Sequence, residues 1–194
     1  IDPLAFESTA YLARKRISKD SLGVLLSKAS ETVRKSEIGK RTREFIRNDQ
    51  LQPSDKFKPI RCFDVNMNKF DWNSVKGKKF TIIVGGLWCM THGMDNSLPK
   101  QYFESIKEKY GDSHQLILYV YCNDSEEMKE EIKEFGLEDY TVISDFKGRA
   151  TPFSSIYNCQ ATPTCIYTDA EGIIVNIMEG LDPNYLENEF ILKQ

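Results

Sequence analysis

A cysteine and a histidine three residues apart, Cys89 and His92, are the side chains in this sequence best suited to chemistry. They follow an apolar run at 80–84 whose β-branched residues, bounded by glycines, predict a buried strand. A helix is expected to begin at Cys89. A helix N-terminus stabilises a thiolate because its N–H groups are unpaired and carry partial positive charge. The pattern therefore predicts a reactive thiol.

The sequence leaves two interpretations of His92 open. Protonated, it would lower the pKa of the Cys89 thiol towards the range of roughly 3.5–7.5 that activated thiols show. Asp95, three residues further along a helix, is then a candidate tuning acid that orients and charges the imidazole. In the other interpretation His92 is a solvent-facing side chain, since perturbed ionisable groups also occur in purely structural networks.

Metal binding is a less favoured chemistry for the same residues. Cysteine and histidine suit copper or zinc, but Cys89 and His92 supply two ligands and a structural zinc needs four. The other histidine, His114, is expected at the start of a later strand. We predict no metal site and no organic cofactor.

Composition places the chain in an ordinary globular class. Its 194 residues are 40% hydrophobic and 28% charged, with a net charge of −3 and interspersed signs. The basic stripe of a nucleic-acid binder is missing, so no nucleic-acid partner is expected. No apolar stretch approaches the roughly 18 residues of a transmembrane segment. The five cysteines have irregular spacing, and Cys62, Cys122 and Cys165 are interpreted as small buried hydrophobic residues.

The chain divides into a helical extension at 1–50 and a second domain at 51–194. In the extension, apolar spacing predicts helices around Phe6, after Ser18 and from Ser36, with Ser36 as an N-cap. The basic run at 40–43 is interpreted as a solvated helix face. The stretch at 48–58 is read as a linker.

In the second domain, strands alternate with helices. We expect a hairpin over 60–72, a helix over 89–110, a helix capped by Asp124 and Ser125, strands at 80–87, 116–121 and 141–143, a short helix at 153–157, a hairpin over 164–177 and a last helix at 185–192. Phe103, Ile106 and Tyr110 recur at helical spacing and are predicted core residues. This order predicts an α/β fold with a sheet of mixed direction.

Three features in this order resemble the thioredoxin-like superfamily, specifically its TlpA/ResA (AhpC-TSA-like) branch. The first is the strand followed by Trp88-Cys89. The second is the segment Tyr157-x-x-x-Ala161-Thr162-Pro163-Thr164, which is similar to the cis-proline loop of that family, and the third is the hairpin at 166–175. The resemblance covers residues 58–192. It implies a thioredoxin-like fold with a mixed central sheet flanked by helices, preceded by the helical extension.

The resemblance also implies roles for individual residues. Cys89 would be the attacking sulfur, and the cis-proline would turn the backbone of Thr162 towards it to hold an extended disulfide partner. The residues implied to contact substrate are Trp88, Met90, Thr91, Thr162 and Pro163. The dithiol members carry Cys-x-x-Cys, whereas His92 stands here at the position of the resolving cysteine. Cys159 is either a substitute resolving thiol or a small core residue.

These observations favour thiol–disulfide exchange with a protein or small-thiol disulfide partner through a single attacking cysteine. The alternative is a redox-inactive binding module that keeps the thioredoxin fold but has lost turnover. Peroxidase activity is disfavoured, because peroxiredoxins need Thr or Ser three residues before the cysteine and this chain has Gly86 there. The resemblance implies a periplasmic or cell-envelope location, with a membrane tether upstream of this sequence as one form of it.

Overall fold

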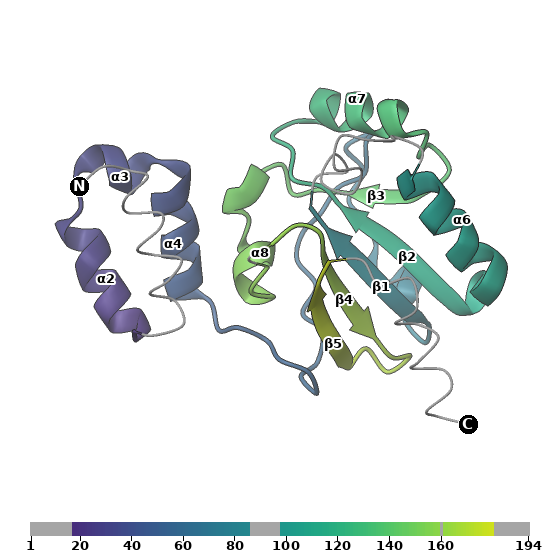
Figure 1. The fold of residues 1–194 in the computed structure, drawn as a ribbon, viewed down its shortest axis with the longest axis horizontal. Helices are drawn as coiled ribbons and strands as arrows, with labels where there is room; N and C mark the ends of the chain where they lie inside the picture. Colours follow the sequence, from purple (N-terminus) through teal and green to yellow (C-terminus); the bar gives the residue numbers. More distant parts are fainter. Residues whose placement is uncertain (1–16, 86–97, 160, 181–194) are drawn as a thin grey trace.

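A computed structural model of the protein describes residues 17–85, 98–159 and 161–180. Within these ranges, a five-stranded sheet has the strand order β3-β2-β1-β4-β5 (Figure 1). The strands are β1 (Lys79–Val84), β2 (His114–Tyr119), β3 (Thr141–Ile143), β4 (Thr164–Thr168) and β5 (Ile174–Glu179). The β1–β2 and β2–β3 pairs are parallel, whereas β1–β4 and β4–β5 are antiparallel. The predicted sheet of mixed direction is confirmed.

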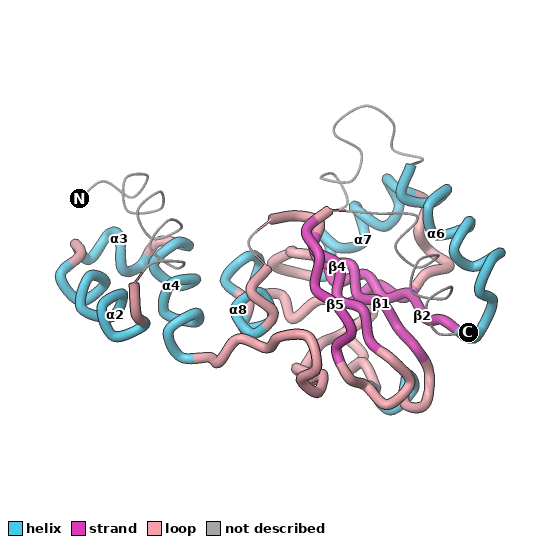
Figure 2. Tube along the Cα trace, turned by 60° about the horizontal axis from the view of Figure 1, so that its bottom comes forward, coloured by secondary structure: helices cyan, strands magenta, loops and turns pink. Residues whose placement is uncertain are grey.

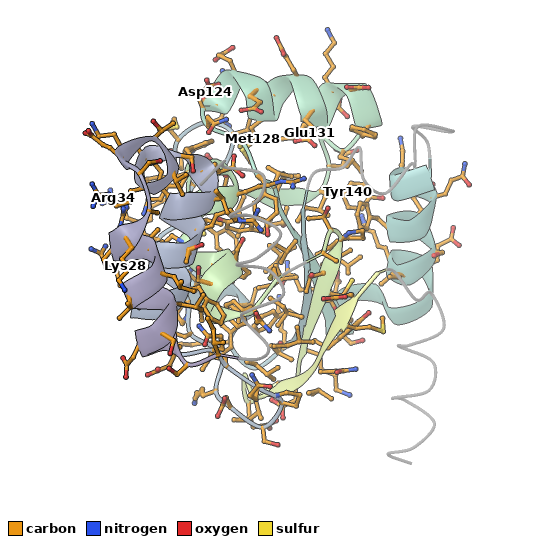
Figure 3. The ribbon with its side chains drawn as sticks, turned by 60° about the vertical axis from the view of Figure 1, so that its left-hand side comes forward. Lys28, Arg34, Asp124, Met128, Glu131 and Tyr140 are labelled. Atoms are coloured by element: carbon orange, nitrogen blue, oxygen red, sulfur yellow. The ribbon has the colours of Figure 1, made fainter. Side chains whose placement is uncertain are left out.

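Helices cover both faces of this sheet. They are α6 (Leu98–Tyr110), α7 (Ser125–Phe135) and α8 (Pro152–Ile156), with short 3-10 helices η1 (Trp72–Val75), η2 (Gly111–Ser113) and η3 (Gly148–Ala150). Figure 2 shows α8 on one side of the sheet and α6 and α7 on the other. A fully buried side chain, Met128, anchors α7, and Figure 3 labels it together with Asp124 at the start of that helix. Asp124 is the N-cap of α7, as the sequence predicts.

Alternation along β1 divides the core into two layers. Ile83 packs into the layer under α6 and α7 with Phe103, Ile106 and Met128. Its neighbours Ile82 and Val84 point to the other face and pack under α8 with Phe153. Successive side chains of a strand point to opposite faces, and an apolar side chain at every one of these positions is what a strand buried on both faces requires.

The helical extension contains α2 (Lys19–Lys28), α3 (Glu31–Lys35) and α4 (Glu37–Arg47). Three serines cap these helices: the side chains of Ser18, Ser30 and Ser36 accept hydrogen bonds from backbone N–H groups at the first turn. The predicted cap at Ser36 is confirmed, and the short α3 was not predicted. The close approach of α3 to α4 depends on Gly39, where a Cβ would lie 2.2 Å from the carbonyl oxygen of Val33.

The extension contacts the sheet domain through α4 and the residues that follow it. The Gln50 side chain donates to the carbonyl oxygen of Ser155 at 3.3 Å, and the Leu51 N–H donates to that of Ile156 at 2.8 Å. Thr42 is fully buried, so the interpretation of 40–43 as a solvated face is wrong in part. Helical periodicity turns the third residue of that run inward, while its first residue, Lys40, is exposed.

The predicted hairpin over 60–72 is reduced to one bridge. Phe63 pairs with Lys69 on one side and with Ser144 on the other, and neither arm forms a strand. The Asp64 carboxylate accepts the N–H groups of Asn66 and Asn68, which closes a tight turn and limits the length of pairing. The second arm ends where η1 begins.

Several predicted elements lie outside the described residues: the first helix around Phe6, the first part of the helix over 89–110 and the last helix at 185–192. The described part of the second of these is α6 (Leu98–Tyr110). No described helix is long and apolar enough to cross a bilayer.

Candidate functional site

The C-terminal end of β1 meets the loop that precedes β4. Gly85 continues β1 by donating its N–H to the carbonyl oxygen of Tyr119 at 3.0 Å. Its φ is +145°, a region that only glycine visits readily. A Cβ on Gly85 would lie 3.0 Å from the Cβ of Thr162 and 3.1 Å from its Cγ2. The chain therefore leaves β1 in direct contact with Thr162.

The loop at Thr162 has a fixed geometry. The Thr162–Pro163 peptide bond is cis. The Thr164 hydroxyl donates to the carbonyl oxygen of Ala161 at 2.7 Å, and the Pro163 carbonyl oxygen accepts the N–H of Gly180 at 2.8 Å. Pro163 is buried, whereas Thr162 is half-buried. Hydrogen bonds on both sides thus hold Thr162 at the end of β1.

The predicted reactive segment itself lies outside the described residues. This applies to Trp88, Cys89, Met90, Thr91, His92 and Asp95. Of the predicted site residues, Thr162 and Pro163 are described, and they lie beside the position where the chain enters that segment. The roles of all eight residues stay predictions.

Four further cysteines are described, and all four are buried: Cys62, Cys122, Cys159 and Cys165. Burial raises the pKa of the Cys62, Cys159 and Cys165 thiols to about 12 and that of Cys122 to about 11. The thiolate is the nucleophilic form, so these four sulfurs are poor nucleophiles near neutral pH. The interpretation of Cys62, Cys122 and Cys165 as small buried residues is confirmed.

Cys159 has the same character. Its exposed fraction is 5%, and its N–H donates to the carbonyl oxygen of Ser154 at 2.8 Å. Burial raises its pKa more than its hydrogen bond with Thr164 lowers it. This environment favours a core residue over a resolving thiol.

A polar network beneath this end of the sheet is a feature that sequence reasoning missed. The Tyr119 hydroxyl donates to the Asp145 carboxylate at 2.7 Å, and the Thr151 hydroxyl donates to the other oxygen of that carboxylate at 2.8 Å. Burial and the nearby Asp145 charge raise the pKa of Tyr119, so the phenol stays protonated and remains a donor. The three residues come from β2, the loop after β3 and the cap of α8, and no local spacing links them.

A second feature that sequence reasoning missed is a positive charge from the helical extension near the C-terminal end of β2. The Ser154 hydroxyl donates to the Tyr121 oxygen at 2.7 Å. Burial raises the pKa of Tyr121, while the guanidinium groups of Arg41 on α4 and Arg149 on η3 act against that rise. A residue of the extension is thus close enough to influence a side chain just beyond β2. Among the described residues, no cluster of three or more His, Cys, Asp or Glu side chains could hold a metal ion.

Several solved structures of thiol-disulfide proteins share the fold of this chain over about three quarters of its length. The thiol-disulfide oxidoreductase of Bacteroides fragilis superposes with a TM-score of 0.58 at 15% identity, over 73% of this chain and 99% of that one. The exposed lipoprotein thioredoxin of Streptococcus pneumoniae gives 0.55 at 19% identity, over 69% and 98%. The protein has a thioredoxin-like fold.

The other comparisons limit what this similarity means. Thiol peroxidase from Chromobacterium violaceum shares the fold too, with a TM-score of 0.54 at 13% identity over 75% of this chain and 89% of that one. No protein-family model matches the sequence, and no curated protein matches it. At these identities the likeness concerns the fold, and the activity has to be argued from the residues of this chain.

Proposed function

We propose that this thioredoxin-like protein carries out thiol–disulfide exchange with Cys89 as its single attacking sulfur. The observation that carries the proposal is the contact between the end of β1 and the cis-proline loop. Gly85, four residues before Cys89, is so close to Thr162 that a Cβ would come within 3.0 Å of it. The segment that contains the predicted thiol therefore starts beside the backbone that would hold a disulfide substrate.

Each site residue then has a defined role. The backbone of Thr162, fixed by the buried Pro163, would hydrogen-bond an extended partner chain. Trp88, Met90 and Thr91 would flank the sulfur and contact the partner. His92 would stabilise the Cys89 thiolate when protonated, and Asp95 would hold the imidazole in that state.

The exchange would need thiols from outside the chain. The Cys89 thiolate attacks one sulfur of the partner disulfide and releases the other sulfur as a thiolate. An external thiolate then attacks the Cys89 sulfur, which frees the second partner thiol and leaves a mixed disulfide on Cys89. A second external thiolate restores the Cys89 thiolate and forms the external disulfide. The raised pKa values of the four buried cysteines support this route over one through an internal resolving thiol.

The partner class follows from this chemistry: a protein or small-molecule disulfide. A location in the cell envelope is part of the proposal, and its support is the resemblance to the TlpA/ResA branch together with the fold shared with an exposed lipoprotein thioredoxin. A less reducing compartment would supply disulfides for such a site.

The test is the rate of alkylation by iodoacetamide as a function of pH, assigned to each cysteine by mass spectrometry. Cys89 is expected to react in the native protein with a midpoint well below the free-thiol value of about 8.5. The four buried cysteines serve as internal controls, because they should react only after denaturation. Substitution His92→Ala should move the Cys89 midpoint upward.

The same experiment separates the alternative. A Cys89 that is inert, or that titrates like a free thiol in both the parent and the His92→Ala protein, would overturn the catalytic proposal. It would leave a thioredoxin-fold binding module, in which Cys89→Ser leaves partner binding unchanged.

A further inference from the structure

A cavity of about 740 Å³ lies at the opposite end of β1 from Thr162. It is bounded by the linker at 56–59, by the segment at 69–77 that contains η1, by Phe80 near the start of β1, and by the β4–β5 turn at 170–172. Its volume falls within the range of roughly 300–1,000 Å³ that is typical of small-molecule sites. The six residues of β1, at about 3.3 Å each, put roughly 20 Å between the two ends.

Aromatic rings form the wall of this cavity. The Phe57 and Trp72 ring centroids are 5.0 Å apart, and those of Phe70 and Trp72 are 4.9 Å apart with an edge-to-face angle of 86°. All three side chains are half-buried and line the cavity. They pack on the core beneath them without being enclosed by it. A ring wall of this kind stacks well against a planar aromatic group.

The wall is formed before any ligand arrives. The Trp72 Nε1–H donates to the carbonyl oxygen of Ile60 at 2.7 Å, which fixes the indole and leaves no donor on its edge. The Phe57 N–H donates to the carbonyl oxygen of Gly172 at 2.8 Å and ties the linker to the β4–β5 turn. A preformed site loses less conformational entropy when a ligand binds, so more of the contact free energy appears as affinity.

Charges surround the aromatic wall. Lys56, Lys69 and Lys76 line the cavity together with Asp71 and Glu171, which leaves a balance of one positive charge. Within the described ranges, none of these lysines takes part in an ion pair. The Asp71 carboxylate is engaged by the N–H and side-chain amide of Asn73 at 3.0 and 2.8 Å. Besides these hydrogen bonds from Asn73, Lys69 and Lys76 are also close enough to Asp71 to help lower the pKa of its carboxyl group. The three ammonium groups still outnumber the two carboxylates, so a ligand meets a net positive charge.

A strand-like peptide does not fit this site as well as a small molecule does. The backbone beside the cavity is already paired: Lys56 forms a bridge with Ile173, and the Ile174 N–H donates to the carbonyl oxygen of Asp55. No strand edge remains there for an added chain among the residues described. We propose that this cavity is a binding site for a small planar aromatic molecule that carries a single negative charge.

The experiment uses two dyes that differ by one charged group. Anilinonaphthalene sulfonate is an aromatic monoanion with a planar naphthalene ring, and phenylnaphthylamine is the same ring system without the sulfonate. Binding is followed by dye fluorescence and by quenching of tryptophan fluorescence. The sulfonate is expected to bind saturably with one site per chain and more tightly than the neutral dye.

Charge variants locate the site. The double substitution Lys69→Gln/Lys76→Gln should weaken sulfonate binding by roughly 3- to 10-fold, the effect of two partly screened charges. Glu171→Gln should tighten it by about 2- to 3-fold for the same reason. Neutral-dye binding should change little in both. Lys28→Gln, an exposed lysine on α2 that Figure 3 labels, is the matched control and should change nothing.

The result of the dye-binding experiment is independent of the test of the Cys89 proposal. Non-saturable sulfonate binding, equal affinity for the two dyes, or an unchanged affinity in the lysine double variant would each overturn the inference. Near-ultraviolet circular dichroism of every variant guards against dye uptake by a loosened fold, because that signal is lost when tertiary packing is lost. None of the substituted residues lies at the cis-proline end, so failure here leaves the alkylation test of Cys89 untouched.

Discussion

Substitution Gly85→Ala tests the contact on which the proposed site depends. Gly85 has a φ of +145° and faces Thr162. Alanine at this position pays two separate penalties: a backbone conformation unfavourable for any residue with a Cβ, and a crowded approach to the side chain of Thr162. Both penalties arise from the single methyl group that alanine adds.

The magnitudes of the two effects can be separated. Strain from an unfavourable φ costs about 1–3 kcal/mol, and overpacking against a neighbour that must move costs about 1–3 kcal/mol. We expect Gly85→Ala to lower the free energy of unfolding by about 4 kcal/mol. Gly172→Ala is the reference, because Gly172 has a φ of +76° with no atom within 4 Å of the built Cβ. It should cost about 1–2 kcal/mol from backbone strain alone.

The assay is urea unfolding followed by far-ultraviolet circular dichroism, with linear extrapolation to water. A double-mutant cycle isolates the contact. In the Thr162→Gly background the crowded side chain is gone, so Gly85→Ala should cost about 1–3 kcal/mol less than in the parent. Equal losses for Gly85→Ala and Gly172→Ala, or a cycle without coupling, would refute the apposition of β1 and the cis-proline loop.

Four further substitutions test other parts of the fold. Gly39→Ala should lower the melting temperature, because its Cβ would lie 2.2 Å from a backbone carbonyl oxygen. Gly23→Ala on α2, with open space around it, should raise the free energy of unfolding by about 0.5–1 kcal/mol. A change of the same sign in both variants would contradict the packing of α3 on α4. Tyr119→Phe should cost about 1.5–3 kcal/mol in urea unfolding, since it removes a donor from a buried carboxylate, and a neutral effect would count against the network. Burial, followed by the Lys79 charge, lowers the pKa of His114 from 6.5 to about 4, so the unfolded chain binds a proton there that the native chain does not. Stability should therefore fall as pH drops through that window, by about 3 kcal/mol in all. Unfolding free energies of the parent and His114→Gln, measured at several pH values, should diverge there, and parallel curves would argue against a buried neutral imidazole.

Much of the fold could be predicted because its elements are set by local patterns. The strand at 141–143 was expected at the bounds that β3 has, and Asp124 caps α7 as predicted. The apolar runs that became β1 and β4 are buried almost throughout, as strands in the middle of a sheet must be. Where a pattern repeats over a few residues, the sequence is sufficient.

Predictions that depended on distant residues were less complete. The arms at 60–72 have strand-like composition, but Asp64 closes a tight turn and the first arm divides its pairing between Lys69 and Ser144. Thr42 sits inside a basic run and is nevertheless buried. The turn at Asp64 is local, but the pairing of Phe63 with Ser144 cannot be read from neighbours in the chain, because Ser144 follows β3. Helical spacing likewise gives Thr42 a face, and only the packing of α4 decides that this face is buried.

The sequence by itself determined the types and spacing of the chemical groups: a cysteine after a buried strand, a histidine three residues on, and a Thr-Pro pair before a hairpin. Spacing along the chain carries this information because strand and helix geometry repeat over short distances. Tertiary structure alone decided which groups meet. It brought Thr162 against Gly85, buried four thiols beyond easy ionisation, and set three aromatic rings around a cavity at the far end of β1. Burial and proximity are properties of packing between distant segments, and they determine which side chain can ionise, stack or react.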